Sequence, residues 1–167
     1  MLEPSIVELP KRQFVGLEAA FIHGLSPETT NYKVIPPLWE AFGARAKEVP
    51  HRVGKAMFGV IYGLPEAERK HPHELQYVAG VEISQAGELP AGMVLHTVPA
   101  GTFAGFIHRG PIQKIAETVG PIYRQWLPQS GYRHANIADI ELYDHRFDGC
   151  SEESEMEYWV SVERAEG

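Results

Sequence analysis

The sequence has a single cysteine, no excess of positive charge and no long apolar run, and each lack excludes a class of protein. Cys150 cannot form an intramolecular disulfide, so a reducing, cytoplasmic setting is expected. Lys and Arg number 15 against 22 Asp and Glu, a net charge of -7, so direct binding of nucleic acid is not expected. The most apolar stretch, residues 92–107, is interrupted by polar residues and proline, whereas a membrane helix needs about 20 apolar residues. No membrane segment is expected.

Catalytic and metal-binding motifs are also missing. The chain has no Gly-x-Ser-x-Gly elbow, no P-loop and no Gly-x-Gly-x-x-Gly run. His71 and His73 flank a proline, but no third ligand lies nearby in the sequence, so no metal is expected there. Cys150 lies in an acidic segment without the basic neighbours that activate a thiolate. These absences favour a binding protein over an enzyme, and no cofactor is expected.

What the sequence does contain is a repeat. With 167 residues, 44% of them hydrophobic, the chain has the size of one domain, residues 1–167. Three groups of residues match between the two halves in the same order, at offsets of 89, 84 and 81. The matches are Pro10, Phe14 and Gly16 with Pro99, Phe103 and Gly105; Pro37, Trp39 and Phe42 with Pro121, Tyr123 and Trp126; and Tyr62 and Tyr77 with Tyr143 and Tyr158.

The repeated unit is predicted to be βαββ, over residues of about 4–84 and 93–164, joined by the Gly/Pro-rich segment 85–92. Apolar residues at helical spacing predict a helix over residues 112–126, and β-rich runs predict strands that include residues 57–62 and 156–162. Two such units form an α+β fold, an antiparallel sheet with both helices on one face, because each helix must bury its apolar stripe. We expect a ligand cleft on the opposite face.

The last predicted strand has an unusual outward face. Side chains alternate along a strand, so Met156 and Tyr158 lie on one face, and Glu157 and Trp159 lie on the other. A tryptophan beside a carboxylate, on the face away from the helices, is typical of a concave binding surface. The alternative is an exposed polar strand that carries an incidental tryptophan.

Other aromatic and acidic residues are candidates for the same cleft. Tyr62 and Tyr143 end predicted strands, where they either pack in the core or line the cleft. Glu141 is a candidate for a second cleft carboxylate. Trp39 and Trp126 lie in the two matching helix segments and are expected in the core.

Four segments follow one another in the second half: VPAGTFAGFIHRGP at 98–111, WLPQSGY at 126–132, IELYD at 140–144 and MEYWVSV at 156–162. Together they resemble consecutive signatures of the bacterial GyrI-like (gyrase-inhibitor-like) family. This family supplies the effector-binding domain of AraC-type regulators and of multidrug-sensing MerR-type regulators. The resemblance extends over essentially the whole chain and is strongest over residues 94–163.

The resemblance implies a pseudo-twofold fold with an aromatic cleft, in which an acidic residue of the last strand faces bound organic cations. Glu157 matches that position, and Gln76 stands at the equivalent position of the first half, so one wall of the cleft is expected to be charged. Residues 61–65 depart from the more usual Tyr-Tyr-Asp-x-Pro of the family, which puts the ligand preference of that wall in doubt. The candidate ligand-binding residues are Glu157, Trp159, Tyr62, Tyr143, Glu141 and Phe106.

The expected function is stand-alone binding of amphipathic, cationic small molecules. Because the two repeats account for this sequence, no DNA-binding module is expected, and control of transcription would then need a separate protein partner, which the sequence does not identify. The resemblance leaves two alternatives. One is hydrolysis of reactive cyclopropane-containing natural products, with Glu157 as the catalytic acid or base. The other is a gyrase-inhibitor-like interaction with another protein.

Overall fold

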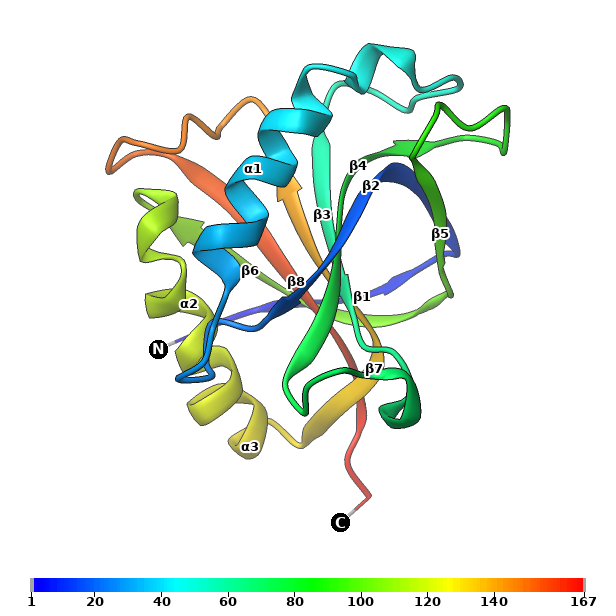
Figure 1. Cartoon of the computed structure of the whole chain (residues 1–167). Helices are drawn as coiled ribbons and strands as arrows, with labels where there is room; N and C mark the ends of the chain where they lie inside the picture. The colour runs from blue at the N-terminus through cyan, green and yellow to red at the C-terminus, as the bar shows by residue number, and fades with distance from the viewer. Residues whose placement is uncertain (1, 167) are drawn as a thin grey trace.

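One antiparallel sheet organises the molecule. In a computed structural model that describes residues 2–166, eight strands form a curled sheet, and the helical segments cover one of its faces (Figure 1). This arrangement confirms the α+β class and the placement of both helices on one face. The strands are β1 (Ser5–Leu9), β2 (Arg12–Ile22), β3 (Met57–Tyr62), β4 (Glu74–Ile83), β5 (Val94–Val98), β6 (Gly101–Arg109), β7 (Tyr132–Tyr143) and β8 (Glu155–Arg164).

The order of the strands in the sheet is symmetric. It runs β1-β6-β8-β7-β3-β4-β2-β5, so exchanging the two halves of the chain reverses the order. This symmetry is what a duplicated unit would produce. Each half has one strand more than the predicted βαββ unit, namely β1 in the first half and β5 in the second. Each extra strand pairs with the other half: β1 with β6 and β5 with β2. A βαββ unit alone would leave an unpaired strand edge, which the first strand of the other half covers.

Two helical segments cover the same face of the sheet. The first is a single helix, whereas the second is broken where the sequence predicted one helix over residues 112–126. Pro121 is the last residue of α2, and the π-helical turn begins directly after it. The first helical segment is α1 (Asn31–Gly43). The second helical segment consists of the 3-10 turn Ile112–Lys114, α2 (Ala116–Pro121), the π-helical turn Ile122–Trp126 and α3 (Leu127–Gln129). Further 3-10 turns lie at Ala46–Glu48 and Glu66–Glu68.

The two helical segments pack on separate halves of the sheet, each through a tryptophan. Trp39 of α1 packs against the core formed by β2 and β4, beside the fully buried Phe42. Trp126 packs edge-on against Phe106 of β6, with 5.1 Å between ring centroids. Both tryptophans therefore pack against the core, as predicted. No helix within residues 2–166 is long and apolar enough to cross a membrane.

The face of the sheet away from the helices is filled by a core of its own. Phe14 and Phe103, which the repeat relates, are both buried there, together with Val60 and Val78. The cluster draws buried residues from β2 through β7 because the sheet curls around it. Trp159 of β8 packs against the same cluster. This face is thus occupied by the protein's own side chains.

Candidate functional site

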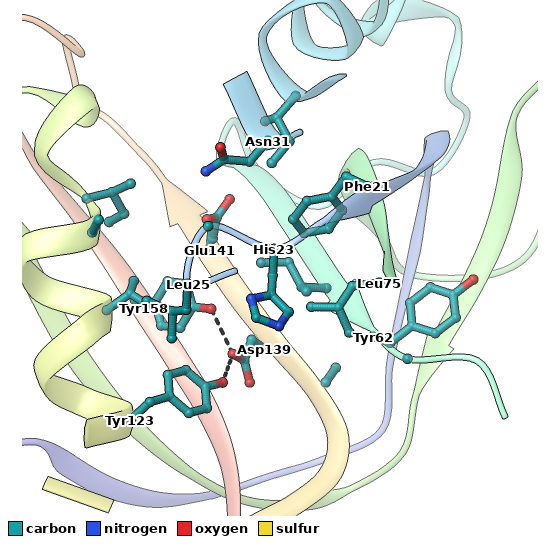
Figure 2. A pocket seen from close by; sticks show the side chains of 18 of the residues that line it. Phe21, His23, Leu25, Asn31, Tyr62, Leu75, Tyr123, Asp139, Glu141 and Tyr158 are labelled. Atoms are coloured by element: carbon teal, nitrogen blue, oxygen red, sulfur yellow. Dashed lines mark hydrogen bonds between the residues drawn. The ribbon is translucent and has the colours of Figure 1, made fainter. Parts of the chain in front are cut away.

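A cavity of about 660 Å³ lies between the helical segments and the sheet (Figure 2). Most of its lining is apolar, which suits the hydrocarbon part of a small molecule. Two carboxylates, Asp139 and Glu141 of β7, also line it, together with several tyrosines. The apolar side chains include Phe21, Leu25, Ile35, Ile61, Leu75, Ile115 and Val119.

The cavity lies on the helix-covered face, whereas the cleft predicted from the sequence was on the opposite face. The opposite face is closed by the core around Phe14 and Phe103. On the helix face, α1 packs on the strands of the first half and the second helical segment packs on those of the second half. The central strands β3 and β7 lie between these two packed layers, and their side chains on this face line the cavity.

Glu141 is a buried carboxylate of this cavity, with 8% of its surface exposed. Its Oε1 accepts hydrogen bonds from the hydroxyls of Tyr77, at 2.5 Å, and Tyr143, at 3.0 Å. The indole Nε1 of Trp39 donates to the Tyr77 hydroxyl at 2.8 Å, which directs that hydroxyl's proton toward Glu141. None of the ion pairs within residues 2–166 involves Glu141.

The surroundings of Glu141 shift the pKa of its carboxyl and of the two tyrosine hydroxyls bound to it. Burial raises the pKa of the Glu141 carboxyl, the two tyrosine hydroxyls oppose that rise, and the charge of Asp139 adds to it. Burial, and then the charge of Glu141, raise the pKa of Tyr77 and of Tyr143 well above the usual value, so both hydroxyls stay protonated and donate. A cation in the cavity would favour the ionised form of Glu141.

Asp139 forms a second polar group in the same cavity. Its Oδ2 accepts hydrogen bonds from the hydroxyls of Tyr158, at 2.7 Å, and of Tyr123 (Figure 2). Its Oδ1 accepts a hydrogen bond from Nε2 of His134 at 2.9 Å. Burial opposes a charged imidazole, but the hydrogen bond and the charge of Asp139 outweigh it and raise the pKa of His134. Asp139 therefore has a titratable cation beside it, and Glu141 has none among residues 2–166.

A β-bulge in β7 brings His134 and Asp139 together. The pairing of β7 with β8 changes register between these two residues, and Asn136 between them has a φ of 58°, in the left-handed region. The backbone N–H of Asn136 donates to Nδ1 of His134 at 2.9 Å. The neutral ring therefore carries its proton on Nε2, facing Asp139. The bulge fixes both the position and the tautomer of the imidazole.

Three histidines cluster at one side of the cavity, and one of them lines it. The ring of His23, the lining residue, is 5.3 Å from that of His73, which is 5.6 Å from that of His71. Burial, and then the two neighbouring histidines, lower the pKa of His23. Within residues 2–166, no group of three or more His, Cys, Asp or Glu side chains is arranged to hold a metal ion.

Glu157 and Trp159 lie side by side, but outside this cavity. The Trp159 indole donates to Oε1 of Glu157 at 2.9 Å, and the Trp159 ring packs against the core on the face away from the helices. The guanidinium of Arg146 binds Oε2 of Glu157, so this carboxylate already has its cation. The Trp159 ring also fills the space that a Cβ at Gly105 would take. The structure thus places both residues in a packed ion-pair cluster and not in the cavity.

The other four predicted residues divide between the cavity and the core. Glu141 and Tyr143 line the cavity from β7. Tyr62 touches the edge of the cavity, but its ring points away from Asp139 (Figure 2), and its hydroxyl donates to Glu18 at 2.6 Å. Phe106 packs in the core under the second helical segment, because its position on β6 faces that segment.

Sequence reasoning missed several residues of the cavity, although part of the signal was present. Residues 138–143 alternate strictly, so that Asp139, Glu141 and Tyr143 share one face of β7 and the apolar residues between them face the other core. This alternation could have found Asp139. No such pattern marks His134, because the bulge interrupts the period of the strand. The lining residues missed are Asp139, His134, His23, Tyr123 and Tyr158. Tyr77, which binds Glu141 without lining the cavity, was missed as well.

The sequence has close counterparts among known proteins. The family model of the GyrI-like small molecule binding domain matches residues 2–163. The chain belongs to the GyrI-like family. This GyrI-like chain is 34% identical to the transcriptional regulator BrlR of Pseudomonas aeruginosa over 162 residues, which cover 96% of the chain and 56% of BrlR. It is 35% identical to a DNA gyrase inhibitor of Yersinia enterocolitica over 105 residues, 58% of the chain and 64% of that protein. The matched regions thus span less than two thirds of each relative.

Solved structures share the GyrI-like fold over nearly the whole chain. The structure of SAV2435 bound to tetraphenylphosphonium has a TM-score of 0.76 and 14% identity, covering 97% of this chain and 94% of that one. The C-terminal domain of EcmrR has a TM-score of 0.66 and 19% identity, covering 99% of each chain. At these identities the likeness establishes the fold alone.

Proposed function

We propose that this GyrI-like small-molecule binding domain binds amphipathic organic cations in the cavity between its helices and its sheet, and that Glu141 selects for positive charge. The observation that carries the proposal is the state of Glu141, a buried carboxylate that accepts two tyrosine hydroxyls and has no cationic partner within residues 2–166. Glu157, to which the family resemblance assigned this role, already binds Arg146.

A buried carboxylate without a cation is costly, and a cationic ligand relieves that cost. Two unit charges 4 Å apart gain about 4 kcal/mol gross at an effective dielectric constant near 20, whereas an exposed ion pair contributes about 0–1 kcal/mol. Both tyrosine hydroxyls bind Oε1 of Glu141, which leaves Oε2 available to a ligand. Glu141 is therefore placed to distinguish a cation from a neutral molecule of the same shape.

The apolar and aromatic lining supports the binding of the ligand's body. Burying about 300 Å² of apolar ligand surface contributes roughly 7 kcal/mol, against an association cost of about 4–15 kcal/mol. Aromatic faces such as those of Phe21 and Tyr143 contribute on the order of 0.5–2 kcal/mol each when they contact a cation. Affinity then depends mainly on apolar area, and preference for positive charge depends on Glu141. The neighbour SAV2435 was solved with tetraphenylphosphonium, a cation of this kind.

Calorimetry with tetraphenylphosphonium as the probe tests the proposal. Glu141→Gln keeps the shape of the side chain and an oxygen for both tyrosine hydroxyls but removes the charge, so affinity should fall about tenfold or more. Triphenylphosphine oxide, a neutral ligand of similar size, should bind the variant as well as it binds the wild type. Equal losses for both ligands would show that Glu141 only supports the cavity.

Glu157→Gln is the matched control, because it makes the same substitution on the other face of the sheet. Its affinity for tetraphenylphosphonium should equal that of the wild type, since Glu157 is bound to Arg146 and does not line the cavity. A loss of affinity in Glu157→Gln, with no loss in Glu141→Gln, would return the site to the face away from the helices.

One observation favours a second candidate function, hydrolysis of strained electrophiles in the same cavity. Burial raises the pKa of Glu141, and a carboxyl with a raised pKa can act as a general acid; the Tyr77 hydroxyl, held by Trp39, lies beside it. In the opening of a cyclopropane, the carboxyl would protonate the departing carbon, water would add to the electrophilic carbon, and the added water would return a proton to the carboxylate.

Mass spectrometry after incubation with cyclopropane-containing natural products tests this second candidate. The product is a ring-opened alcohol, heavier than the substrate by one water. The wild type should form it and Glu141→Gln should not, even where Glu141→Gln still binds the substrate. Recovery of unchanged substrate from the wild type would contradict hydrolysis and leave the binding proposal unaffected.

A further inference from the structure

Asp139 and Glu141 present two carboxylates to one cavity. They lie two residues apart on β7, so their side chains share a face and their Cα atoms are about 7 Å apart. Both are buried, at 5% and 8% exposure. Each accepts hydrogen bonds from two tyrosine hydroxyls. The charge of Asp139 opposes the ionisation of Glu141, and a ligand with two positive groups would remove that opposition.

The two carboxylates differ in one partner. Asp139 accepts a hydrogen bond from Nε2 of His134, whereas no histidine, lysine or arginine within residues 2–166 pairs with Glu141. When His134 is protonated, its imidazolium neutralises the charge of Asp139. When His134 is neutral, it donates the same hydrogen bond but leaves that charge uncompensated. The negative charge that the cavity offers to a ligand thus depends on the protonation of His134.

We propose that Asp139 is a second cation subsite beside Glu141, that the cavity accordingly takes organic ligands with two cationic groups about 7 Å apart, and that His134 closes this subsite when it is protonated. The proposal rests on the function proposed above and adds to it the class of ligand and the pH at which that ligand binds.

Among the side chains packed around Asp139, His134 is the one that changes protonation toward neutral pH, because the tyrosines stay protonated. Although burial opposes the charged ring, Asp139 raises the pKa of His134, so its protonation extends toward neutral pH. Tyr123, from the second helical segment, stacks on the ring with 6.0 Å between centroids. Burial, and then the charge of Asp139, raise the pKa of Tyr123 and of Tyr158 on β8, so both stay protonated. Asn136, on the same strand, donates its backbone N–H to the other ring nitrogen.

Three other charged or titratable side chains of the cavity lining, those of His23, Arg69 and Glu141, do not compensate the charge of Asp139. His23, at the end of β2, has a lowered pKa and stays neutral to lower pH. Arg69, which also lines the cavity, donates from Nε to the carbonyl of Leu64 at 2.7 Å and forms no ion pair among residues 2–166. Glu141 shares the face of β7 with Asp139 and is the first subsite. Burial raises the pKa of Glu141, and its protonation in acid would weaken the two-cation and the one-cation ligand alike. The pH dependence of the preference for the two-cation ligand is therefore assigned to His134.

Two probe ligands of the same length test the subsite. One is a pentane chain with a trimethylammonium group at each end, and the other carries trimethylammonium at one end and an uncharged tert-butyl group at the other. Calorimetry at about pH 8, above the ordinary histidine pKa of about 6.5, should show the dication binding about tenfold more tightly than the monocation. At about pH 5.5 the two affinities should be nearly equal, because His134 then neutralises Asp139.

Three variants separate the roles of the residues. Asp139→Asn should bind the two probes with equal affinity at both pH values, because the second carboxylate charge is then absent. His134→Gln should keep the dication preference at both pH values, because Asp139 is then never neutralised. His73→Gln is the control, since it removes a nearby histidine that does not line the cavity, and it should keep the wild-type pH dependence.

The outcomes distinguish this proposal from the function on which it rests. Equal binding of the two probes by the wild type at pH 8, with the monocation still dependent on Glu141, would overturn the second subsite and leave cation binding in place. Binding of neither probe would overturn both. If Asp139→Asn does not fold, His134→Gln tests the proposal at pH 5.5. This variant should still prefer the dication there, and loss of that preference, as expected for the wild type, would contradict the role of His134.

Discussion

The Tyr77 hydroxyl donates to Glu141 at 2.5 Å and joins the two halves of the chain across the middle of the sheet. Its repeat counterpart, Tyr158, donates to Asp139 in the same way. Matching helix positions supply a third member to each group, with Trp39 bound to Tyr77 and Tyr123 bound to Asp139. The two halves thus supply equivalent donors, but both acceptors come from β7. The repeat accounts for the aromatic walls, and the departure from symmetry accounts for the charge.

Gly59 of β3 lies directly beneath the bond between Tyr77 and Glu141. A Cβ at this position would overlap the Tyr77 hydroxyl and Oε1 of Glu141. Gly59→Ala should therefore lower the free energy of unfolding by about 1–3 kcal/mol and weaken tetraphenylphosphonium binding. Urea denaturation and calorimetry measure the two effects. Gly43→Ala is the control, because the space around Gly43 at the end of α1 is open and alanine favours a helix.

Removing the charge of Glu141 should stabilise the fold while weakening cation binding. Because burial raises the folded-state pKa of Glu141 above 4.5, the folded protein holds the proton more tightly than the unfolded chain. The stability this confers is present below pH 4.5 and is lost as the pH rises through the folded-state pKa. Glu141→Gln should thus be more stable than the wild type at pH 7, by about 1 kcal/mol, with the difference vanishing in acid. Denaturation curves of both proteins across this pH range measure the difference in stability. Equal stability at pH 7 would contradict the prediction.

His134 and His23 should give stability profiles of opposite sign. Since Asp139 outweighs burial and raises the pKa of His134, its contribution to stability is full below pH 6.5 and is lost as the pH rises through the folded-state value. Burial and its histidine neighbours lower the pKa of His23, so its ionisation destabilises the fold as the pH falls below 6.5. Relative to the wild type, His134→Gln should lose most stability in acid and His23→Gln should gain there. Profiles with the same slope would contradict these assignments.

Trp39, and not Trp159, should report ligand binding by fluorescence. Trp39 donates to Tyr77, whose hydroxyl contacts Glu141, whereas Trp159 packs on the far face of the sheet. Trp39→Phe should remove most of the change in tryptophan emission on titration with a lipophilic dye, and Trp159→Phe should leave it. If Trp159→Phe abolishes the change instead, the ligand binds on the face away from the helices.

The alternation in β8 and the repeat predicted which residues are neighbours but not which of them face the cavity. The prediction that Glu157 and Trp159 lie together follows from a period of two residues and agrees with their hydrogen bond. Tyr62 and Tyr143 match in the repeat, yet Tyr143 packs on Trp39 under α1 while Tyr62 stacks on His96 on the other side. A shift of one residue between the halves turns a side chain to the opposite face of a sheet, and sequence spacing alone does not reveal that shift.

The sequence by itself determined the fold class, the antiparallel sheet, the helices on one face and the small-molecule binding family, because these depend on local periodicity and on motifs whose order is fixed along the chain. Only the tertiary structure decided which face of the sheet is open and which carboxylate is left without a cation. Those outcomes depend on the curl of the sheet, which fills one face with Phe14 and Phe103, and on the contact between Arg146 and Glu157. They depend also on the bulge that turns His134 toward Asp139. Each of these is a relation between strands or across a bulge, which local sequence patterns do not encode.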